Sequence, residues 1–173
     1  MHNIVKRVID WNSARYDQQY DHELATKLIE EEFNEWLDAN TPVQELDALC
    51  DIVYVAIGAL WKINATWGEE QLQESFEKRE HIFYVAMHLS MMKHATMEAS
   101  VYVDIIACAY SQMYTMGLTG EQAIASMLAV CDSNDSKAVQ KTLFNVKTNI
   151  DKGPDYFPPT KALESILCQL TTH

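Results

Sequence analysis

Two stretches in the first third of the chain repeat apolar residues at α-helical spacing, and this periodicity constrains the fold more than any other feature. Residues 21–39 begin with Asp21 as an N-cap and carry an apolar stripe made of Leu24, Leu28, Ile29, Phe33, Trp36 and Leu37. A second segment, from Thr41 to about Ile63, begins with a Thr cap, a Pro at the first helical position and a Gln that completes the pattern of a capping box. Its second half is apolar on all sides, which predicts a buried, central helix.

The rest of the chain favours helices as well. Further helices are expected at 69–92, from 101 to a stop at Gly117, at 120–131 after a capping box of Thr119 and Gln122, and at 136–148. The polar segment DSNDSK predicts a break after residue 131, and the three prolines of KGPDYFPP exclude regular helix there. Because the chain has only five Gly and four Pro in 173 residues and no strand alternation, it is expected to form one all-α helical bundle spanning 1–173.

Composition and charge narrow the classes of partner. A net charge of −12 repels the phosphate backbone, and no cluster of Lys or Arg compensates, so nucleic acid is excluded as a partner. No stretch has the length of a membrane span or of a signal peptide's apolar core. The cysteines are far apart and predict buried free thiols in a reducing compartment: Cys50, Cys108, Cys131 and Cys168. A soluble, cytoplasmic protein is expected.

A group of carboxylates between residues 31 and 51 is the strongest candidate for a functional site. Glu31, Glu32 and Glu35 form an EExxE pattern, and residues three or four apart share one face of a helix. Taken alone, such a pattern is more often a solvated acidic face than a site. Asp47 and Asp51 follow on the next helix, four residues apart.

Asp51 changes this balance because it falls inside the apolar run from Leu49 to Val55. A carboxylate there loses hydration, which is costly unless the group is paired, metal-bound or protonated. The short connection near residues 40–42 makes the two helices antiparallel neighbours, so their acids can face each other. Carboxylate oxygens without His or Cys suit Mg²⁺ or Mn²⁺. A salt bridge to Lys or Arg, or a hydrogen bond with Tyr, is the alternative interpretation of Asp51.

This arrangement resembles the MazG-like, all-α NTP pyrophosphatase superfamily, whose members carry EExxE on one helix and an acidic pair, usually ExxD, on the next. The first motif is intact as EEFNE. The second departs, because Ala48 stands three residues before Asp51 and the other acid is Asp47, in a DALxDxxY pattern similar to phage and bacterial members related to phosphoribosyl-ATP pyrophosphohydrolase. Asp51 is therefore the firmer ligand, and Asp47 is either a ligand or a neighbour that supports one.

Three more segments extend the resemblance to both ends of the chain. WNSAR at 11–15 is similar to the superfamily's lead-in, where an Asn or Gln often meets the base. SNDSK at 133–137 is similar to its SNxSK segment, and KGPDYFPP at 152–159 is similar to its KGPxYFPP tail. The resemblance implies substrate contacts from Asn12, Asn134, Lys137, Lys152 and Tyr156. The two lysines are also the charges that an acidic protein needs to meet phosphate oxygens. Residues 65–105 have no counterpart and suggest an inserted helical hairpin, and 152–173 form a Pro-rich tail.

The resemblance implies cleavage of a (d)NTP between its α and β phosphates, giving a (d)NMP and pyrophosphate. Mg²⁺, with Mn²⁺ as the other candidate, would be held by Glu31, Glu32, Glu35, Asp47 and Asp51, and Glu31 or Glu35 would act as the general base. The superfamily's usual assembly implies a homodimer or homotetramer.

Two alternatives remain open. One is a phosphoribosyl-ATP pyrophosphohydrolase-like enzyme with the same chemistry, and the other is a non-catalytic nucleotide-binding protein, which Ala48 at the position of the second acid suggests. The six histidines form no HxxxH or HExxH pair, and no ExxH motif occurs, which argues against zinc and di-iron sites. Asp104, a further acid in an apolar run, either pairs with a lysine or joins the site from the insertion.

Overall fold

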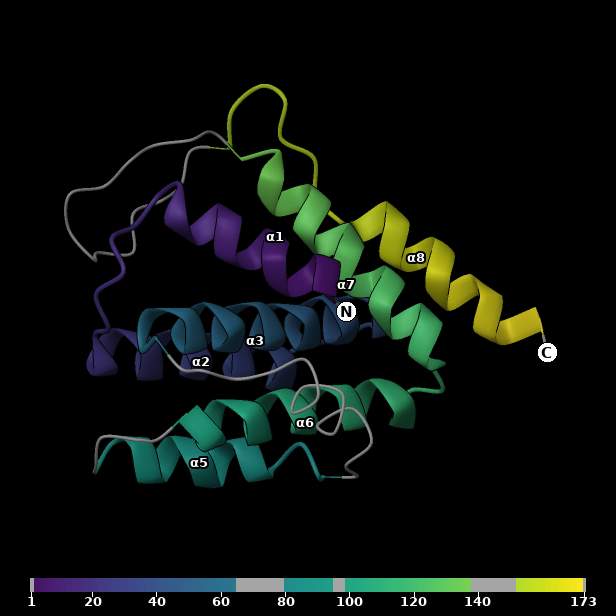
Figure 1. Cartoon of the computed structure of the whole chain (residues 1–173). Helices are drawn as coiled ribbons and strands as arrows, with labels where there is room; N and C mark the ends of the chain where they lie inside the picture. Colours follow the sequence, from purple (N-terminus) through teal and green to yellow (C-terminus); the bar gives the residue numbers. More distant parts are fainter. Residues whose placement is uncertain (1, 65–79, 95–98, 138–151, 173) are drawn as a thin grey trace.

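The computed structural model describes residues 2–64, 80–94, 99–137 and 152–172, and in these ranges the chain is an all-α bundle (Figure 1). The described helices are α1 (His2–Ser13), α2 (His22–Leu37), α3 (Pro42–Lys62), α5 (Tyr84–Met92), α6 (Ala99–Thr115), α7 (Gly120–Asp135), α8 (Thr160–Cys168) and the 3-10 helix η1 (Gln169–Thr172). No strand occurs in these ranges, which confirms the predicted fold class.

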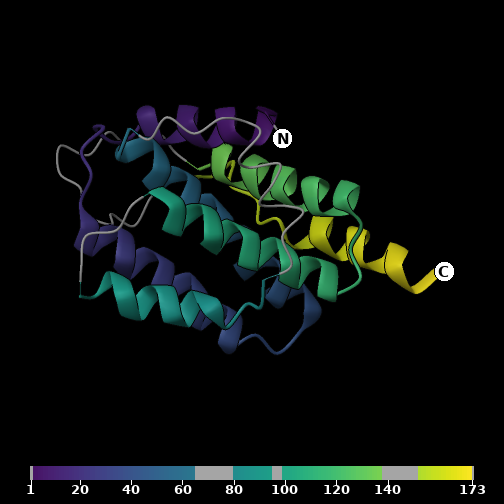
Figure 2. The same ribbon diagram turned by 60° about the horizontal axis from the view of Figure 1, so that its bottom comes forward.

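Helix α3 lies at the centre of the bundle. It contacts α1, α2, α6, α7 and α8. The α2–α3 hairpin forms a middle layer, with α1 and α7 on one side of it and α5 and α6 on the other (Figures 1 and 2). Buried residues follow one another along α3 from Leu46 to Leu60 with few interruptions. The all-round apolar sequence of this helix therefore corresponds to its central position, as predicted.

Local sequence signals begin α2 and α3 where they were expected to. The Asp21 carboxylate accepts a hydrogen bond from the Leu24 N–H at 3.0 Å, and the Thr41 hydroxyl accepts one from the Gln44 N–H at 3.3 Å. Only one of the two hydrogen bonds of the capping box expected at α3 forms, so this prediction is half wrong. The Gln44 side chain accepts from the N–H of Asn40, at 3.0 Å, instead of from that of the cap residue.

Helix α6 ends and α7 begins at the predicted signals. Gly117 has a φ of 94°, a left-handed conformation that ends a helix at little cost for glycine. Thr119 and Gln122 form the predicted reciprocal capping box. The predicted break after residue 131 is wrong, because α7 continues to Asp135. A tertiary contact overrides the polar composition here: Asn134 is buried and its carbonyl oxygen accepts from the indole N–H of Trp11 at 2.8 Å.

Two further segments differ from the expected helices. Residues 80–83 are not helical, so the predicted continuous helix 69–92 is wrong in this part, and the Glu80 N–H donates to the Ser111 hydroxyl on α6 at 3.0 Å. Residues 152–159 are non-helical as predicted, but the tail then forms α8, whose Leu163 is buried. Residues 65–79, and all but the first two residues of the expected helix 136–148, lie outside the described residues.

None of the four cysteines forms a disulfide. Cys50, Cys108 and Cys131 are buried as predicted, whereas Cys168 on α8 is exposed, which corrects that part of the prediction. No helix in the described ranges is long and apolar enough to cross a membrane.

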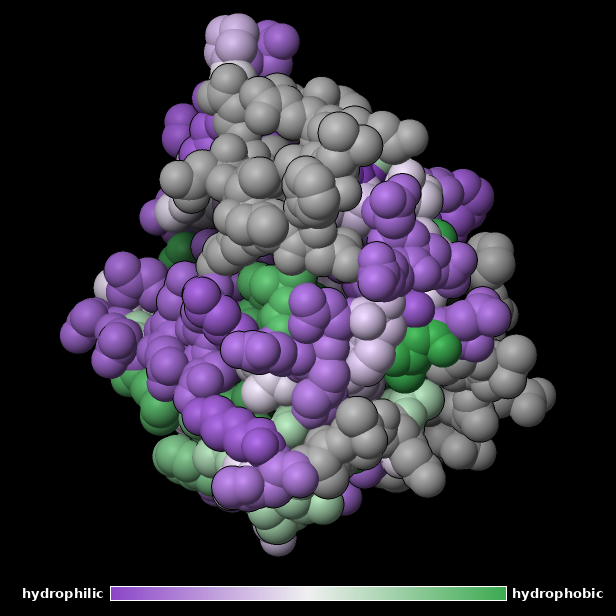
Figure 3. All heavy atoms as spheres, turned by 90° about the vertical axis from the view of Figure 1, so that its left-hand side faces the viewer, coloured by the Kyte–Doolittle hydropathy of each residue, from purple (hydrophilic) through white to green (hydrophobic). Residues whose placement is uncertain are grey.

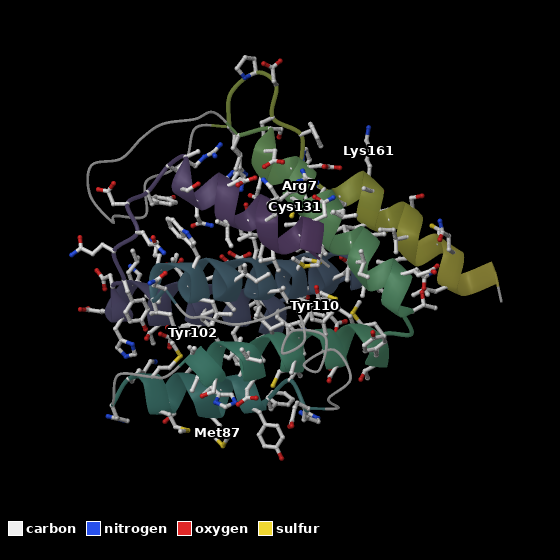
Figure 4. All side chains as sticks on the ribbon, in the orientation of Figure 1. Arg7, Met87, Tyr102, Tyr110, Cys131 and Lys161 are labelled. Atoms are coloured by element: carbon white, nitrogen blue, oxygen red, sulfur yellow. The ribbon has the colours of Figure 1, made fainter. Side chains whose placement is uncertain are left out.

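Helix α5 contains no Asp, Glu, Lys or Arg, and exposed apolar side chains lie along it and just before it: Phe83, Tyr84, Met87 and Met91. Met87 lies on the side of α5 that points away from the bundle (Figure 4). Seen from the left of Figure 1, the molecule is mainly hydrophilic, with apolar atoms more frequent along its lower edge, at the level of α5 and α6 (Figure 3). The surface of these four side chains is called the α5 apolar face below.

Candidate active site

The predicted acids are brought together by the antiparallel α2–α3 hairpin (Figure 1). Glu32 is half-buried and Glu35 exposed on α2, while Asp47 and Asp51 are half-buried, one turn apart, on α3. The carboxylates of Glu32, Asp47 and Glu35 all act on the charge of Asp51. The acids of the two helices therefore face a common region.

Burial and like charges make this region unfavourable for carboxylates alone. Burial of its carboxyl group raises the pKa of Asp51 well above the usual range, and the charges of Glu32 and Asp47 raise it further. The pKa of Asp47 is also raised, first by burial and then by the charge of Glu35. Ionised carboxylates in this position need a cation nearby.

Two lysines supply part of that positive charge. Lys137, two residues after the end of α7, lowers the pKa of both Asp47 and Asp51, and Lys152 lowers that of Asp47. The Lys137 ammonium donates to the Asn134 side-chain oxygen at 2.6 Å. The Lys152 ammonium lies 4.9 Å from the ring centre of Tyr156. The residues assigned from the SNDSK and KGPDYFPP segments thus lie beside the acids of α3.

Asn12 approaches α3 from the end of α1. It is buried, its amide donates to the Val8 carbonyl at 2.8 Å, and it packs against Gly58, where an added Cβ would come within 3.2 Å of the amide nitrogen. Gly58 follows Asp51 by seven residues, so Asn12 sits about 10 Å along the same face of α3. The glycine is required by this close approach.

Aromatic and cationic side chains surround the end of α1, a grouping that sequence reasoning did not assign to the site. The Trp11 ring lies edge-on to Tyr54 of α3, with 5.7 Å between centroids. The guanidinium of Arg15 lies 4.3 Å from the centre of the Trp11 ring. The four-residue spacing of Trp11 and Arg15 in the WNSAR motif agrees with their contact, but nothing in the sequence showed that Tyr54 of α3 would meet them.

Not every predicted ligand converges on one point. Glu31 is half-buried on α2, and the carboxylates whose charges raise the pKa of Asp51 are Glu32, Asp47 and Glu35. In the described ranges no three His, Cys, Asp or Glu side chains are close enough, in their present conformations, to hold a metal ion. Like-charged carboxylates repel one another and so favour separated rotamers. The donor chemistry still fits a hard divalent cation, because oxygen ligands from two helices face a region where burial raises their pKa values.

Comparison with known families matches the same part of the chain. Residues 2–80 match the family model described as phosphoribosyl-ATP pyrophosphohydrolase, and this range contains α1, α2 and α3 with all five predicted acids. No curated protein and no solved structure matches the chain. The matched family is typically metal-dependent and supports a pyrophosphohydrolase-type activity on nucleotides. The match covers the amino-terminal part of the chain and supports its resemblance to the all-α NTP pyrophosphatase superfamily.

Proposed function

We propose that the protein is a Mg²⁺-dependent nucleoside triphosphate pyrophosphohydrolase, which cleaves a (d)NTP to a (d)NMP and pyrophosphate. The observation that carries this proposal is the position of Asp51, a half-buried carboxyl group on which the charges of Glu32, Asp47, Lys137 and Glu35 all act. A fold gains nothing from such a group unless a cation binds it. The family match to the same helices supports the proposal.

In this proposal, the acids divide between metal binding and proton transfer. Glu31, Glu32, Glu35 and Asp51 would hold Mg²⁺, or Mn²⁺, and Asp47 would either bind it or support Asp51. The bound ion would neutralise phosphate charge and lower the pKa of a coordinated water. Glu31 or Glu35 would accept the proton of the attacking water, since a carboxylate within hydrogen-bond reach can act as a general base.

The remaining residues would bind the substrate. Lys137 and Lys152 would meet phosphate oxygens, which their effect on the pKa of Asp47 supports, and the Asn134 side chain would orient the Lys137 ammonium through their hydrogen bond. Asn12, about two turns along α3 from Asp51, would meet the base, because that separation of about 10 Å suits a nucleoside attached to the reacting phosphates. Tyr156, beside Lys152, would complete this side of the site.

Product analysis tests the proposal directly. The purified protein is incubated with each NTP, each dNTP and phosphoribosyl-ATP in the presence of Mg²⁺, and monophosphate and pyrophosphate are measured. Release from one or more (d)NTPs is expected. Strong preference for phosphoribosyl-ATP would favour the alternative substrate, and nucleotide binding without release from any substrate would overturn the hydrolase proposal in favour of a binding protein.

A matched pair of variants on α2 tests the acids. Glu35→Gln is expected to abolish turnover while the circular dichroism spectrum keeps its helical form, because the substitution removes a charge and little volume. Glu23→Gln, an exposed change in the first turn of the same helix, serves as the control and should keep full activity. Activity retained in Glu35→Gln would remove this glutamate from the mechanism.

The homodimer or homotetramer implied by the superfamily is also part of the proposal. The α5 apolar face supports it, because an exposed apolar surface without charges lets two copies of an acidic chain meet without local repulsion.

A further inference from the structure

Side chains from α1 and from the turn that follows it hold the carboxyl end of α7. The Trp11 indole N–H donates to the Asn134 carbonyl at 2.8 Å, and one terminal nitrogen of Arg15 donates to the Lys137 carbonyl at 3.0 Å. The other terminal nitrogen of Arg15 donates to the Trp11 carbonyl at 3.2 Å. The Asn134 carbonyl also accepts from the Lys137 N–H at 3.1 Å, so the indole is its second donor, and Arg15 adds a donor for the carbonyl of Lys137, two residues beyond the end of α7.

Arg15 is held in one conformation. It is only 3% exposed, its guanidinium lies over the Trp11 ring, and burial lowers its pKa. A buried arginine is costly unless its donors are used, and the planar guanidinium suits simultaneous stacking and hydrogen bonding. The Lys137 carbonyl is therefore bound to a rigid group.

The other end of Lys137 is also fixed. Its ammonium donates to the side-chain oxygen of Asn134, and the carbonyl of that same asparagine is the one held by Trp11. The ammonium lies close enough to Asp47 and Asp51 to lower the pKa of both. The backbone and side chain of Lys137 thus both depend on contacts made by Trp11 of α1 and by Arg15 in the turn after it.

We propose that Arg15 is a positioning residue that, together with Trp11, fixes Lys137 so that its ammonium faces the Asp47–Asp51 pair and the substrate phosphates. Arg15 acts through Lys137 and does not itself touch the substrate. The proposal rests on the proposed function for the role of Lys137 in the reaction, but the positioning itself is a property of the free protein.

Arg7 provides a control on α1 itself. It precedes Arg15 by eight residues and joins α1 to α7 through ion pairs with Asp132 at 2.7 Å and Asp135 at 2.5 Å (Figure 4). These partners are on α7 itself, before Lys137. Loss of Arg7 should weaken the attachment of the two helices without releasing the Lys137 carbonyl.

A double-mutant cycle tests whether Arg15 acts through Lys137. Lys137→Met is expected to lower kcat/KM by about ten- to a hundredfold, the factor that follows from losing one charge-assisted contact. Arg15→Met should also lower kcat/KM, and the loss should be shared between kcat and KM in the same proportion as in Lys137→Met. The double variant should equal Lys137→Met within about twofold, because a residue that acts only through another adds nothing once that residue is gone.

Arg7→Met separates positioning from stability. It should lower the melting temperature and keep kcat/KM near the wild-type value. In the double variant with Lys137→Met, the fold-changes in kcat/KM of the two single variants should multiply. Arg15→Lys, which keeps a charge and a donor, is the second variant if Arg15→Met does not fold, and an intermediate loss is expected. Independent, multiplicative effects of Arg15 and Lys137, or an Arg15 variant that changes only stability, would overturn the proposal.

A labelling experiment gives a readout without turnover. Acetic anhydride modifies free amines, and mass spectrometry compares Lys137 with Lys161, an exposed lysine on α8 (Figure 4). Lys137 should react more slowly than Lys161 in the wild type and in Arg7→Met, and faster in Arg15→Met. If the wild type hydrolyses no nucleotide but this change occurs, the proposed function fails and the positioning stands. Unchanged Lys137 labelling in Arg15→Met refutes the positioning.

Discussion

Replacing Asp51 with Asn tests whether this buried carboxylate serves a cation or the fold. Without a divalent cation, Asp51 meets the charges of three carboxylates and one ammonium, which leaves two uncompensated like charges. At an effective dielectric constant of about 20, two unit charges one Debye length (about 8 Å) apart repel by about 2 kcal/mol, and screening by salt reduces this to about 1 kcal/mol for each charge. Asp51→Asn should therefore stabilise the metal-free protein by about 2 kcal/mol, or about 4–8 °C in melting temperature for a chain of 173 residues.

Addition of Mg²⁺ should reverse the order of stability. A ligand present at about a hundred times its Kd stabilises the native state by about 2.7 kcal/mol, and the variant lacks the carboxylate through which this occurs. The assay is thermal unfolding followed by circular dichroism, once with EDTA and once with saturating Mg²⁺. Asp17→Asn, an exposed change in the loop before α2, is the control and should follow the wild type in both conditions.

Two results would refute this reasoning. If Asp51→Asn is less stable than the wild type in EDTA, the carboxylate accepts hydrogen bonds that the fold requires, and the salt bridge or tyrosine interpretation of Asp51 gains support. If Mg²⁺ stabilises both proteins equally, Asp51 takes no part in binding the ion. Pyrophosphate release by the variant would lead to the same conclusion.

Three further predictions concern the surroundings of the site. Gly58→Ala should destabilise the protein by about 1 kcal/mol, because displacement of Asn12 outweighs the gain in helix propensity, and it should raise KM more than it lowers kcat if Asn12 meets the base. A thiol reagent should label only Cys168 quickly in the native protein, since the other three cysteines are buried and burial raises the pKa of Cys131 to about 12; rapid labelling of a second thiol would contradict the fold. Met87→Glu should lower the molecular mass measured by light scattering if copies meet through the α5 apolar face, and an unchanged mass would remove this face from the interface.

The features that could be predicted from the sequence are those that depend on neighbours along the chain. The caps at Asp21 and Thr41, the stop at Gly117 and the Thr119 capping box all satisfy backbone groups within four residues. Helical spacing and the apolar character of α3 also predicted its central position. Each of these signals involves groups that meet whatever the rest of the fold does.

The errors arise where distant segments change the local outcome. The polar composition of DSNDSK predicted a break, but Trp11, more than a hundred residues away in sequence, satisfies the Asn134 carbonyl and buries this end of α7. The Gln44 side chain accepts from the Asn40 N–H and not from the N–H of the cap residue Thr41. The two donors are adjacent in the backbone, and a sequence pattern does not distinguish them. Residues 160–168 form a helix because Leu163 packs in the buried core of the bundle. The prolines before this helix had suggested an irregular tail.

The candidate site was predicted unevenly for the same reason. Helical periodicity places Glu31, Glu32 and Glu35 together, and a short connection brings Asp47 and Asp51 opposite them, so the acids required only local reasoning. Arg15 offered no such signal, because its partner is the carbonyl of a residue 122 positions later.

Charge explains why this distant contact matters to the site. The chain carries a net charge of −12, and the acids of α3 have Lys137 and Lys152 as nearby positive groups, each from a segment outside the α2–α3 hairpin. A lysine whose backbone were not held in place would bind phosphate weakly, since a flexible ammonium loses conformational entropy when it is fixed. Arg15 and Trp11 provide this ordering in advance by holding the chain around Lys137. Phosphate would then meet an ammonium already in place, and this is why loss of Arg15 should affect the reaction as loss of Lys137 does.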